Sequence, residues 1–324
     1  MTAHSPFPFA YGNLINYSTG LVLYNPGDIT RVPYSQNSFW KFASGDWTNL
    51  GFSAVAGTLP ADTKGQTAYY DGTNVNVAFG TSGNLDGSGF YGGYSGTTSV
   101  YNGTSFSTSP IAWSPTTPTA APYPRTKCMS TYVSGLGKAY IFGGYGQRGI
   151  LPNSQFWSWT NGTGYAQVSG SLPKWRTDGM FVSDGTRALL GFGNANGPMM
   201  FNDLNAWNGT TWSSLNTVNT PSARAGCAAA FDSSTSLYHI WGGYTISNNK
   251  PTFQHLTFNY STLTFADITA AQGNNHPPAM HGASMAYDTT SSQLLLVGGS
   301  DAAGNLSNTT YAYSGGASGS WSVL

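Results

Sequence analysis

An internal repeat of about 55 residues constrains this chain more than any other feature of its sequence. An aromatic residue that opens a short segment after a polar turn recurs six times, at Trp47, Phe106, Tyr165, Trp212, Phe265 and Trp321. Six units of about 54 residues account for all 324 residues, so no room remains for a second domain. A period of this size is typical of propeller-type repeats, in which each unit is one small sheet.

Each unit predicts four short strands. Residues 226–244 and 282–300 are the clearest first pairs, since in both cases two apolar runs flank a polar turn. Turn residues occupy this place in five units, at Asp71-Gly72, Ser134-Gly135, Asp184-Gly185, Asp232-Ser233 and Asp288-Thr289. A second hairpin is predicted at the Asn-Gly pairs that begin at Asn102, Asn161 and Asn208. These tripeptides also match the N-glycosylation acceptor pattern, but we favour the turn.

Glycine pairs close the second strand of several units. They lie at Gly143-Gly144, Gly242-Gly243 and Gly298-Gly299. A glycine pair at a strand end predicts a place where two backbones approach too closely for side chains.

These features resemble the kelch-repeat family. The resemblance rests on the glycine pairs, on Asn202-Asp203-Leu204 ahead of Trp207, and on a proline, a basic residue and a glycine at the start of a unit. Those starts are Pro173 with Arg176 and Gly179, Pro221 with Arg224 and Gly226, and Pro278 with His281 and Gly282. The resemblance implies an all-β, six-bladed kelch-type β-propeller with four antiparallel strands per blade, and loops that form binding faces.

The expected fold is a single domain over residues 1–324. Its blades would span residues 1–58, 59–118, 119–171, 172–221, 222–276 and 277–324. The chain opens with a first-strand pattern and ends with a fourth-strand pattern. We therefore expect the ring to close by packing of the last blade on the first.

Charge is scarce in this sequence. Only 24 residues are charged, 12 basic and 12 acidic, and every acidic residue is Asp. The lack of Glu and the 42 glycines argue against a helical protein. A net charge of zero provides no basic footprint for nucleic acid or anionic membrane. The first residues do not resemble a signal peptide, and no apolar run is long enough for a membrane helix.

Basic residues gather at the starts of the units. Six of the 12 lie there: Lys64, Arg125, Lys127, Lys174, Arg176 and Arg224. They could form a cationic ring that binds an acidic sugar or a phosphate through guanidinium groups. We favour a structural role instead, in which each bonds backbone carbonyls between blades.

Aromatic residues divide into core and loop positions. Trp40, Trp47, Trp207, Trp212 and Trp321 fall on repeat-aligned strands and are predicted to lie between blades. Phe90, Tyr91 and Tyr94 lie in a Gly/Tyr-rich insertion, and Trp113 and Trp175 lie in Pro-rich connections. Aromatic loops on a rigid scaffold suit recognition. The predicted binding residues are therefore Phe90, Tyr91, Tyr94, Trp113, Trp175, Arg125, Arg176 and Arg224.

No catalytic constellation stands out. The five histidines lack metal-ligand spacing, although His239 and His255 could meet across the strands of one blade. Cys128 and Cys227 are expected to be buried, unpaired thiols. The family resemblance includes copper oxidases and iron-dependent specifier proteins. The cysteines do not suit the copper site, and a chain without Glu lacks the iron motif. We expect no metal and no cofactor.

The sequence therefore favours a non-catalytic binding or assembly module. Its composition is similar to that of bacteriophage tail, head-appendage and receptor-binding proteins, which leave the cell by lysis. The expectation is a virion structural or host-attachment protein, present in several copies, that contacts other virion proteins or a host glycan. It would be made in the cytoplasm and act in the virion or outside the lysed cell. A free carbohydrate-binding lectin and a kelch-scaffold enzyme acting on polysaccharide are the alternatives.

Overall fold

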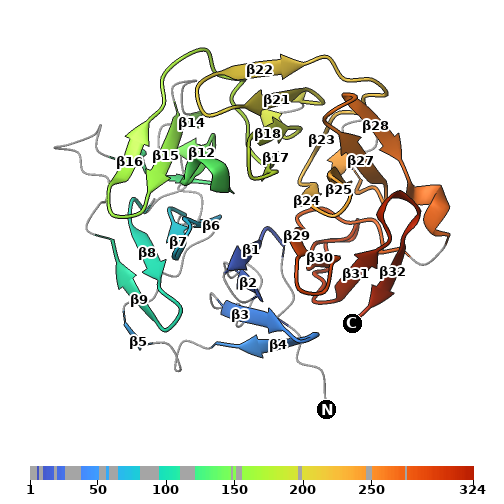
Figure 1. Ribbon diagram of the computed structural model, residues 1–324, viewed down its shortest axis with the longest axis horizontal. Coiled ribbons are helices and arrows are strands. Elements are labelled where there is room, and N and C mark those ends of the chain that lie inside the picture. The colour runs from blue at the N-terminus through green and yellow to red at the C-terminus, as the bar shows by residue number, and fades with distance from the viewer. Residues whose placement is uncertain are drawn as a thin grey trace.

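Six small β-sheets form a ring around a central channel in the computed structural model of this chain (Figure 1). The structure describes residues 6, 10–17, 20–25, 38–50, 56–57, 65–80, 95–109, 121–146, 149–150, 155–195, 199–245, 250–273 and 276–324. Each sheet contains four antiparallel strands that follow one another outward from the channel. The predicted all-β, six-bladed propeller is confirmed.

The blades use strands in sequence order. The first contains β1 (Asn13–Tyr17), β2 (Gly20–Asn25), β3 (Ser38–Ala43) and β4 (Asp46–Asn49), and the second contains β6 (Thr67–Tyr70), β7 (Val75–Ala78), β8 (Thr98–Tyr101) and β9 (Ser105–Thr108). The third contains β11 (Met129–Val133), β12 (Lys138–Phe142), β15 (Phe156–Thr160) and β16 (Gly164–Gln167), and the fourth contains β17 (Met180–Ser183), β18 (Ala188–Gly191), β21 (Leu204–Trp207) and β22 (Trp212–Leu215). The fifth contains β24 (Ala228–Asp232), β25 (Leu237–Trp241), β27 (His255–Asn259) and β28 (Thr264–Asp267), and the sixth contains β29 (Ser284–Asp288), β30 (Gln293–Val297), β31 (Thr310–Ser314) and β32 (Ser320–Val323).

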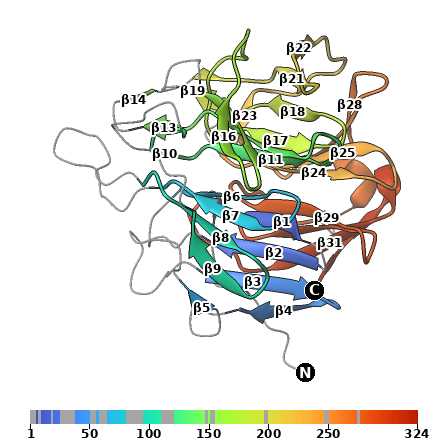
Figure 2. The ribbon, with the colours of Figure 1, turned by 60° about the vertical axis from the view of Figure 1, so that its left-hand side comes forward.

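Short strands and 3-10 helices lie in the connections between the main strands of the blades. The strands among them are β5 (Ala56–Gly57), β10 (Arg125–Thr126), β13 (Tyr145–Gly146), β14 (Gly149–Ile150), β19 (Asn194–Ala195), β20 (Met199–Met200), β23 (Arg224–Ala225) and β26 (Tyr244–Thr245). β10, β13 and β14 form one small sheet, seen at the upper left of Figure 2. The 3-10 helices are η1 (Ser134–Leu136), η2 (Thr269–Gln272) and η3 (Gly316–Ser318). Within the described residues, no helix is long and apolar enough to cross a membrane.

The hydrophobic core lies between the blades. Its buried side chains form six clusters, and each cluster joins two neighbouring blades. The predicted core tryptophans Trp40, Trp47, Trp207 and Trp321 are buried, and Trp212 packs at the edge of a cluster. Apolar burial between sheets therefore stabilises the ring, as expected for repeats that cannot bury their faces alone.

The last blade packs directly on the first, and the strands of each come from one end of the chain (Figure 1). Leu21, Leu23 and Trp47 of the first blade pack against Leu295 and Val297 of the sixth. Trp47 Nε1 also donates to Thr310 Oγ1 at 2.8 Å. Ring closure by blade packing agrees with the expectation from the chain ends.

One strand departs from the predicted blade limits. β5 lies inside the segment predicted for the first blade, yet it pairs in parallel with β9 of the second. A similar single bridge joins Val218, after the fourth blade, to Thr264 of the fifth. The connection that leaves one blade can therefore add to the outer edge of the next.

The predicted turn chemistry is present. Asp71 Oδ1 accepts the backbone N–H groups of Thr73 and Asn74, and Asp184, Asp232 and Asp288 bond their own turns in the same way. Asn102 and Asn208 do so in the second hairpin. These carboxylates and amides replace backbone partners in tight turns.

Candidate functional site: one mouth of the channel

The channel encloses a cavity of about 530 Å³ that is lined by the inner strands β1, β6, β11, β17, β24 and β29. We call the end at which these strands begin the proximal mouth. The residue two places before each inner strand lines it, in order Tyr11, Gly65, Lys127, Asp178, Gly226 and Gly282. The six positions are equivalent by the repeat.

All six residues have a left-handed backbone, with φ between 52° and 69°. Backbone hydrogen bonds link four of the six neighbouring pairs, in which the N–H of one residue donates to the carbonyl of its counterpart in the preceding blade. The described bonds are Lys127 to Gly65 at 2.9 Å, Gly226 to Asp178 and Gly282 to Gly226 at 2.7 Å, and Tyr11 to Gly282 at 2.5 Å. The fold therefore imposes the left-handed conformation at this end of the channel.

Glycine adopts this conformation without strain and occupies three of the six positions. For most other residues it costs about 1–2 kcal/mol, and less for Asn and Asp. Tyr11, Lys127 and Asp178 nevertheless occupy the remaining positions, with φ of 61°, 55° and 52°. Backbone strain of this kind clusters at functional sites. The proximal mouth is therefore our candidate site.

The three strained side chains come together with residues of neighbouring blades. Lys127 Nζ lies 3.5 Å from Asp178 Oδ2 and 5.4 Å from the centre of the Tyr11 ring. Tyr11 OH lies 3.0 Å from His281 Nδ1. The Lys127 side chain is 40% exposed, whereas that of Asp178 is 5% exposed. A solvent-accessible cation is thus held beside a shielded carboxylate.

Amide and hydroxyl groups complete the site on the side of the fifth blade. Asn194 Nδ2 donates to Tyr244 OH at 3.0 Å and lies 3.5 Å from Asp178 Oδ2. Thr177 Oγ1 donates to Asp178 Oδ2 at 3.2 Å. The Tyr244 ring meets His281 edge to face at 5.4 Å. The site therefore offers donors and acceptors in nearly equal measure.

Burial keeps the aromatic groups of the site uncharged. It raises the pKa of Tyr11 well above its ordinary value, and Asp178 and Tyr244 raise it further. Burial, followed by Asp178, also raises the pKa of Tyr244. Burial lowers the pKa of His281, with Asp178 opposing and Lys127 reinforcing that shift. The remaining ionisable side chains of the mouth are Lys127 and Asp178.

The predicted binding arginines lie next to the mouth but are not part of its surface. Arg125, Arg176 and Arg224 are fully buried. Each donates from Nε to a carbonyl two residues earlier, and from Nη1 to the carbonyl at the end of the second strand of its own blade. The second amino group reaches Gln155, Asp203 or Gln254.

These contacts support the structural interpretation, with one change. The guanidinium groups bond carbonyls within a blade, whereas the arginine's own backbone carbonyl joins two blades. Gly80, Gly144 and Gly193 of the preceding blade donate to it. A ligand-binding role would require side chains that reach solvent, and here the guanidinium groups are covered by protein.

The aromatic candidates fall into two groups. Phe90, Tyr91, Tyr94 and Trp113 lie outside the described residues. Trp175 is 7% exposed and its ring meets Tyr145 edge to face at 5.8 Å. It is packed against the protein in this structure.

Other predicted side chains take the positions expected of them. Cys128 and Cys227 are buried and unpaired, and burial raises their pKa to about 12 and about 11. His239 and His255 do meet across strands, with 2.9 Å between their ring nitrogens. Among the described residues, no group of three or more His, Cys, Asp or Glu is arranged to hold a metal ion.

The sequence patterns single out Lys127 and His281 separately but do not bring them together, and they do not point to Tyr11, Asn194 or Tyr244. The register of the unit starts explains this. Gly226 is equivalent to Asp178 rather than to the adjacent Gly179, and Arg224 is equivalent to Met280 rather than to His281. An alignment of the units on their inner strands places Tyr11, Lys127 and Asp178 at the position that Gly65, Gly226 and Gly282 occupy in the other blades.

The fold and the site together define a six-bladed β-propeller with a polar site at one mouth of its channel. No family model matches the sequence, and no curated protein does. Among solved structures, that of YjhT is similar, with a TM-score of 0.73 over 99% of this chain and 98% of that chain. The two sequences are 15% identical, so the likeness is one of fold.

Proposed function

We propose that this protein is a non-catalytic recognition module that binds its ligand at the proximal mouth. The observation that carries the proposal is the occupation of three strained, glycine-favouring positions by Tyr11, Lys127 and Asp178. Glycine would serve the backbone better at each. Side chains at these positions lower the stability of the fold, so their presence is best explained by a ligand that they bind.

The chemistry of the site favours a neutral, hydroxyl-rich ligand. Lys127 and Asp178 balance each other, and Asn194, Tyr11 and Tyr244 add uncharged polar groups beside aromatic faces. Planar polar groups that donate and accept suit sugar hydroxyls, and tyrosine rings provide apolar contact at low entropic cost. A cell-surface glycan fits this description better than a phosphate or an acidic sugar.

The setting that we propose is a bacteriophage virion, in which several copies attach to a neighbour or to the host. Its support is compositional, since 24 charged residues in 324 leave hydroxyl, amide and aromatic groups to meet a partner. Kelch-type ancestry and viral origin form part of this proposal. A protein neighbour at the same mouth is the alternative ligand.

A glycan array followed by calorimetry tests the site. We expect Lys127→Ala, Asp178→Asn and Tyr244→Phe each to weaken binding of the best neutral glycan about tenfold or more, because each removes a hydrogen bond to a charged or buried group. Lys138→Ala is the matched control, since Lys138 is exposed and starts a second strand. Equal affinity in all four variants would refute the site.

A separate experiment tests whether the protein belongs to a bacteriophage virion. Proteomics of purified phage particles should detect the protein in several copies. Its absence from particles, together with no bound glycan and no protein partner, would overturn the proposed function. Product analysis after incubation with the bound glycan covers the enzyme alternative, since any turnover would show that the module is catalytic.

A further inference from the structure

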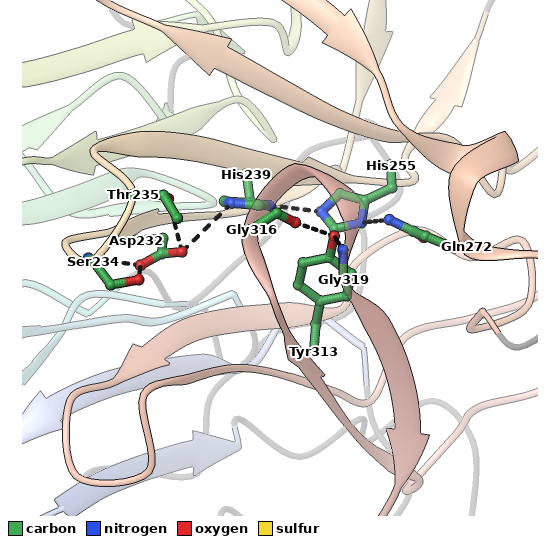
Figure 3. A network of polar contacts seen from close by, with 9 residues as sticks. All are labelled: Asp232, Ser234, Thr235, His239, His255, Gln272, Tyr313, Gly316 and Gly319. Atoms are coloured by element: carbon green, nitrogen blue, oxygen red, sulfur yellow. Dashed lines mark hydrogen bonds and ion pairs between the residues drawn. The ribbon is translucent and has the colours of Figure 1, made fainter.

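A chain of buried polar groups crosses the core between the fifth and sixth blades (Figure 3). His239 on β25 and His255 on β27 are fully buried, and His239 Nδ1 lies 2.9 Å from His255 Nε2. Gln272 Nε2 lies 2.7 Å from His255 Nδ1, and Trp321 of β32 donates from Nε1 to Gln272 Oε1 at 2.9 Å. We call these four residues the histidine relay.

The hydrogen positions in the relay follow from the indole N–H of Trp321. An indole N–H only donates, so Gln272 must present its oxygen to Trp321 and its amino group to His255. His255 Nδ1 then accepts, which leaves Nε2–H to donate to His239 Nδ1. The remaining hydrogen of His239 lies on Nε2, which is buried and points at Asp232 Oδ2 from 3.9 Å. Every hydrogen bond therefore runs from Trp321 toward Asp232.

Aromatic rings and one carboxylate surround the two histidines. Trp241, Tyr313 and Trp321 face His255 with ring centres 4.8–5.6 Å away, and Tyr313 also faces His239. Asp232 is the carboxylate that faces the pair. Its oxygens already accept hydrogen bonds from Ser234 and Thr235. Tyr313 OH donates to the Gly316 carbonyl and accepts from the Gly319 N–H.

We propose that the histidine relay is a proton-sensitive lock that holds the sixth blade to the fifth. A second proton on His239 must bind Nδ1, which already receives the hydrogen of His255. The conflict is relieved if His255 carries its hydrogen on Nδ1 and accepts at Nε2. The side-chain amide of Gln272 must then turn over, so that its oxygen accepts from His255 Nδ1. Reversal ends with the amino group of Gln272 facing the indole N–H of Trp321, so the bond between the blades is lost.

The pKa shifts of His239 and His255 also indicate that the folded protein resists protonation of the pair. Burial lowers the pKa of His239 to about 4, with Asp232 opposing, and burial followed by His239 lowers that of His255 well below its ordinary value. The unfolded chain therefore binds more protons than the folded one between about pH 6.5 and pH 4. Stability contributed by the neutral pair is complete above pH 6.5 and falls as the pH falls toward 4.

The experiment compares two indole hydrogens in the full chain by NMR. Trp321 reports on the relay, and Trp47 is the internal control because its N–H bonds Thr310 Oγ1 between the sixth and first blades without a histidine. From pH 7 to pH 5, after correction for intrinsic exchange, we expect Trp321 to lose roughly 20-fold in protection, the linkage expected for one histidine whose pKa returns from about 4 to its ordinary value when the contact between the two blades opens. Trp47 should change little.

Variants separate a lock from passive packing. His239→Asn keeps an acceptor at the δ position without titrating, so the pH response of Trp321 should shrink. Trp321→Phe removes the donor that opposes reversal, so NMR should show the histidines titrating at higher pH than in the parent. His276→Gln, outside the relay, should behave like the parent.

The lock is overturned if Trp321 and Trp47 lose protection together, or if the response survives unchanged in His239→Asn. An unaltered histidine titration in Trp321→Phe would overturn it as well. The comparison of the two indoles in the unmodified chain remains decisive even if a variant fails to fold.

Discussion

The backbone N–H of Tyr11 donates to the carbonyl oxygen of Gly282 at 2.5 Å, which joins the first blade to the sixth. The Tyr11 hydroxyl reaches the neighbouring His281 at 3.0 Å. Ser284 Oγ donates to the Gly12 carbonyl at 2.7 Å across the same seam. The residue that completes the ring is therefore also a residue of the candidate site, so closure and recognition depend on the same short segment.

The phenol of Tyr11 should contribute measurably to closure. Tyr11→Phe removes a half-buried hydrogen bond to His281 and keeps the ring, so we expect the free energy of unfolding to fall by about 1 kcal/mol. Urea denaturation provides the measurement. Tyr260→Phe is the control, because the Tyr260 ring stacks on Arg187 and that contact survives the change. A loss of equal size in both variants would contradict the role of Tyr11 at the seam.

Glycine is required where neighbouring backbones meet. A Cβ at Gly143 would lie 2.2 Å from the Arg176 carbonyl oxygen, at a φ of +70°. Gly137 has a similar φ of +60° but nothing within 4 Å. We expect Gly137→Ala to cost about 1 kcal/mol from the backbone alone, and Gly143→Ala to cost about 2 kcal/mol more from overpacking. Comparable urea midpoints for the two variants would show that the close approach does not matter.

The buried arginines should stabilise the fold through their hydrogen bonds. Arg176 is fully buried and bonds both oxygens of Asp203, which holds the pKa of that carboxyl below its usual value despite the opposing effect of burial. Arg176→Met removes its bonds to the Lys174 and Phe192 carbonyls and leaves Asp203 with the Asn205 bond, so we expect a loss of roughly 3 kcal/mol in unfolding free energy. Arg187→Met, which removes a partly exposed arginine from its pair with Asp184, should cost about 1 kcal/mol or less. Similar losses in chemical denaturation would argue against the structural role.

Repeat reasoning predicted the fold because the folding signals are local. The six aromatics from Trp47 to Trp321 do lie in outer strands, and the Asp and Asn turns do close hairpins. Each of these features depends on a few neighbouring residues and the period between them. The same reasoning could not detect β5, whose partner strand begins about 50 residues later.

The candidate site depends on register, which the sequence does not display. Tyr11, Lys127 and Asp178 share a position only once the inner strands are aligned, and Asn194 and Tyr244 reach them from the short strands β19 and β26. The tautomers of the histidine relay likewise follow from three-dimensional contacts. Periodicity detects repeated residues, whereas a site in a repeat protein lies where the repeat is broken.

The most direct test of our central claim compares Lys127→Gly with Lys127→Ala for stability and for glycan binding. Both variants remove the amino group, so both should lose binding. Glycine relieves the left-handed backbone, so Lys127→Gly should be more stable than Lys127→Ala by about 1 kcal/mol in urea unfolding. At Lys138, in a regular strand, the order should be reversed. The account is contradicted if Lys127→Gly binds like the parent, or is no more stable than Lys127→Ala.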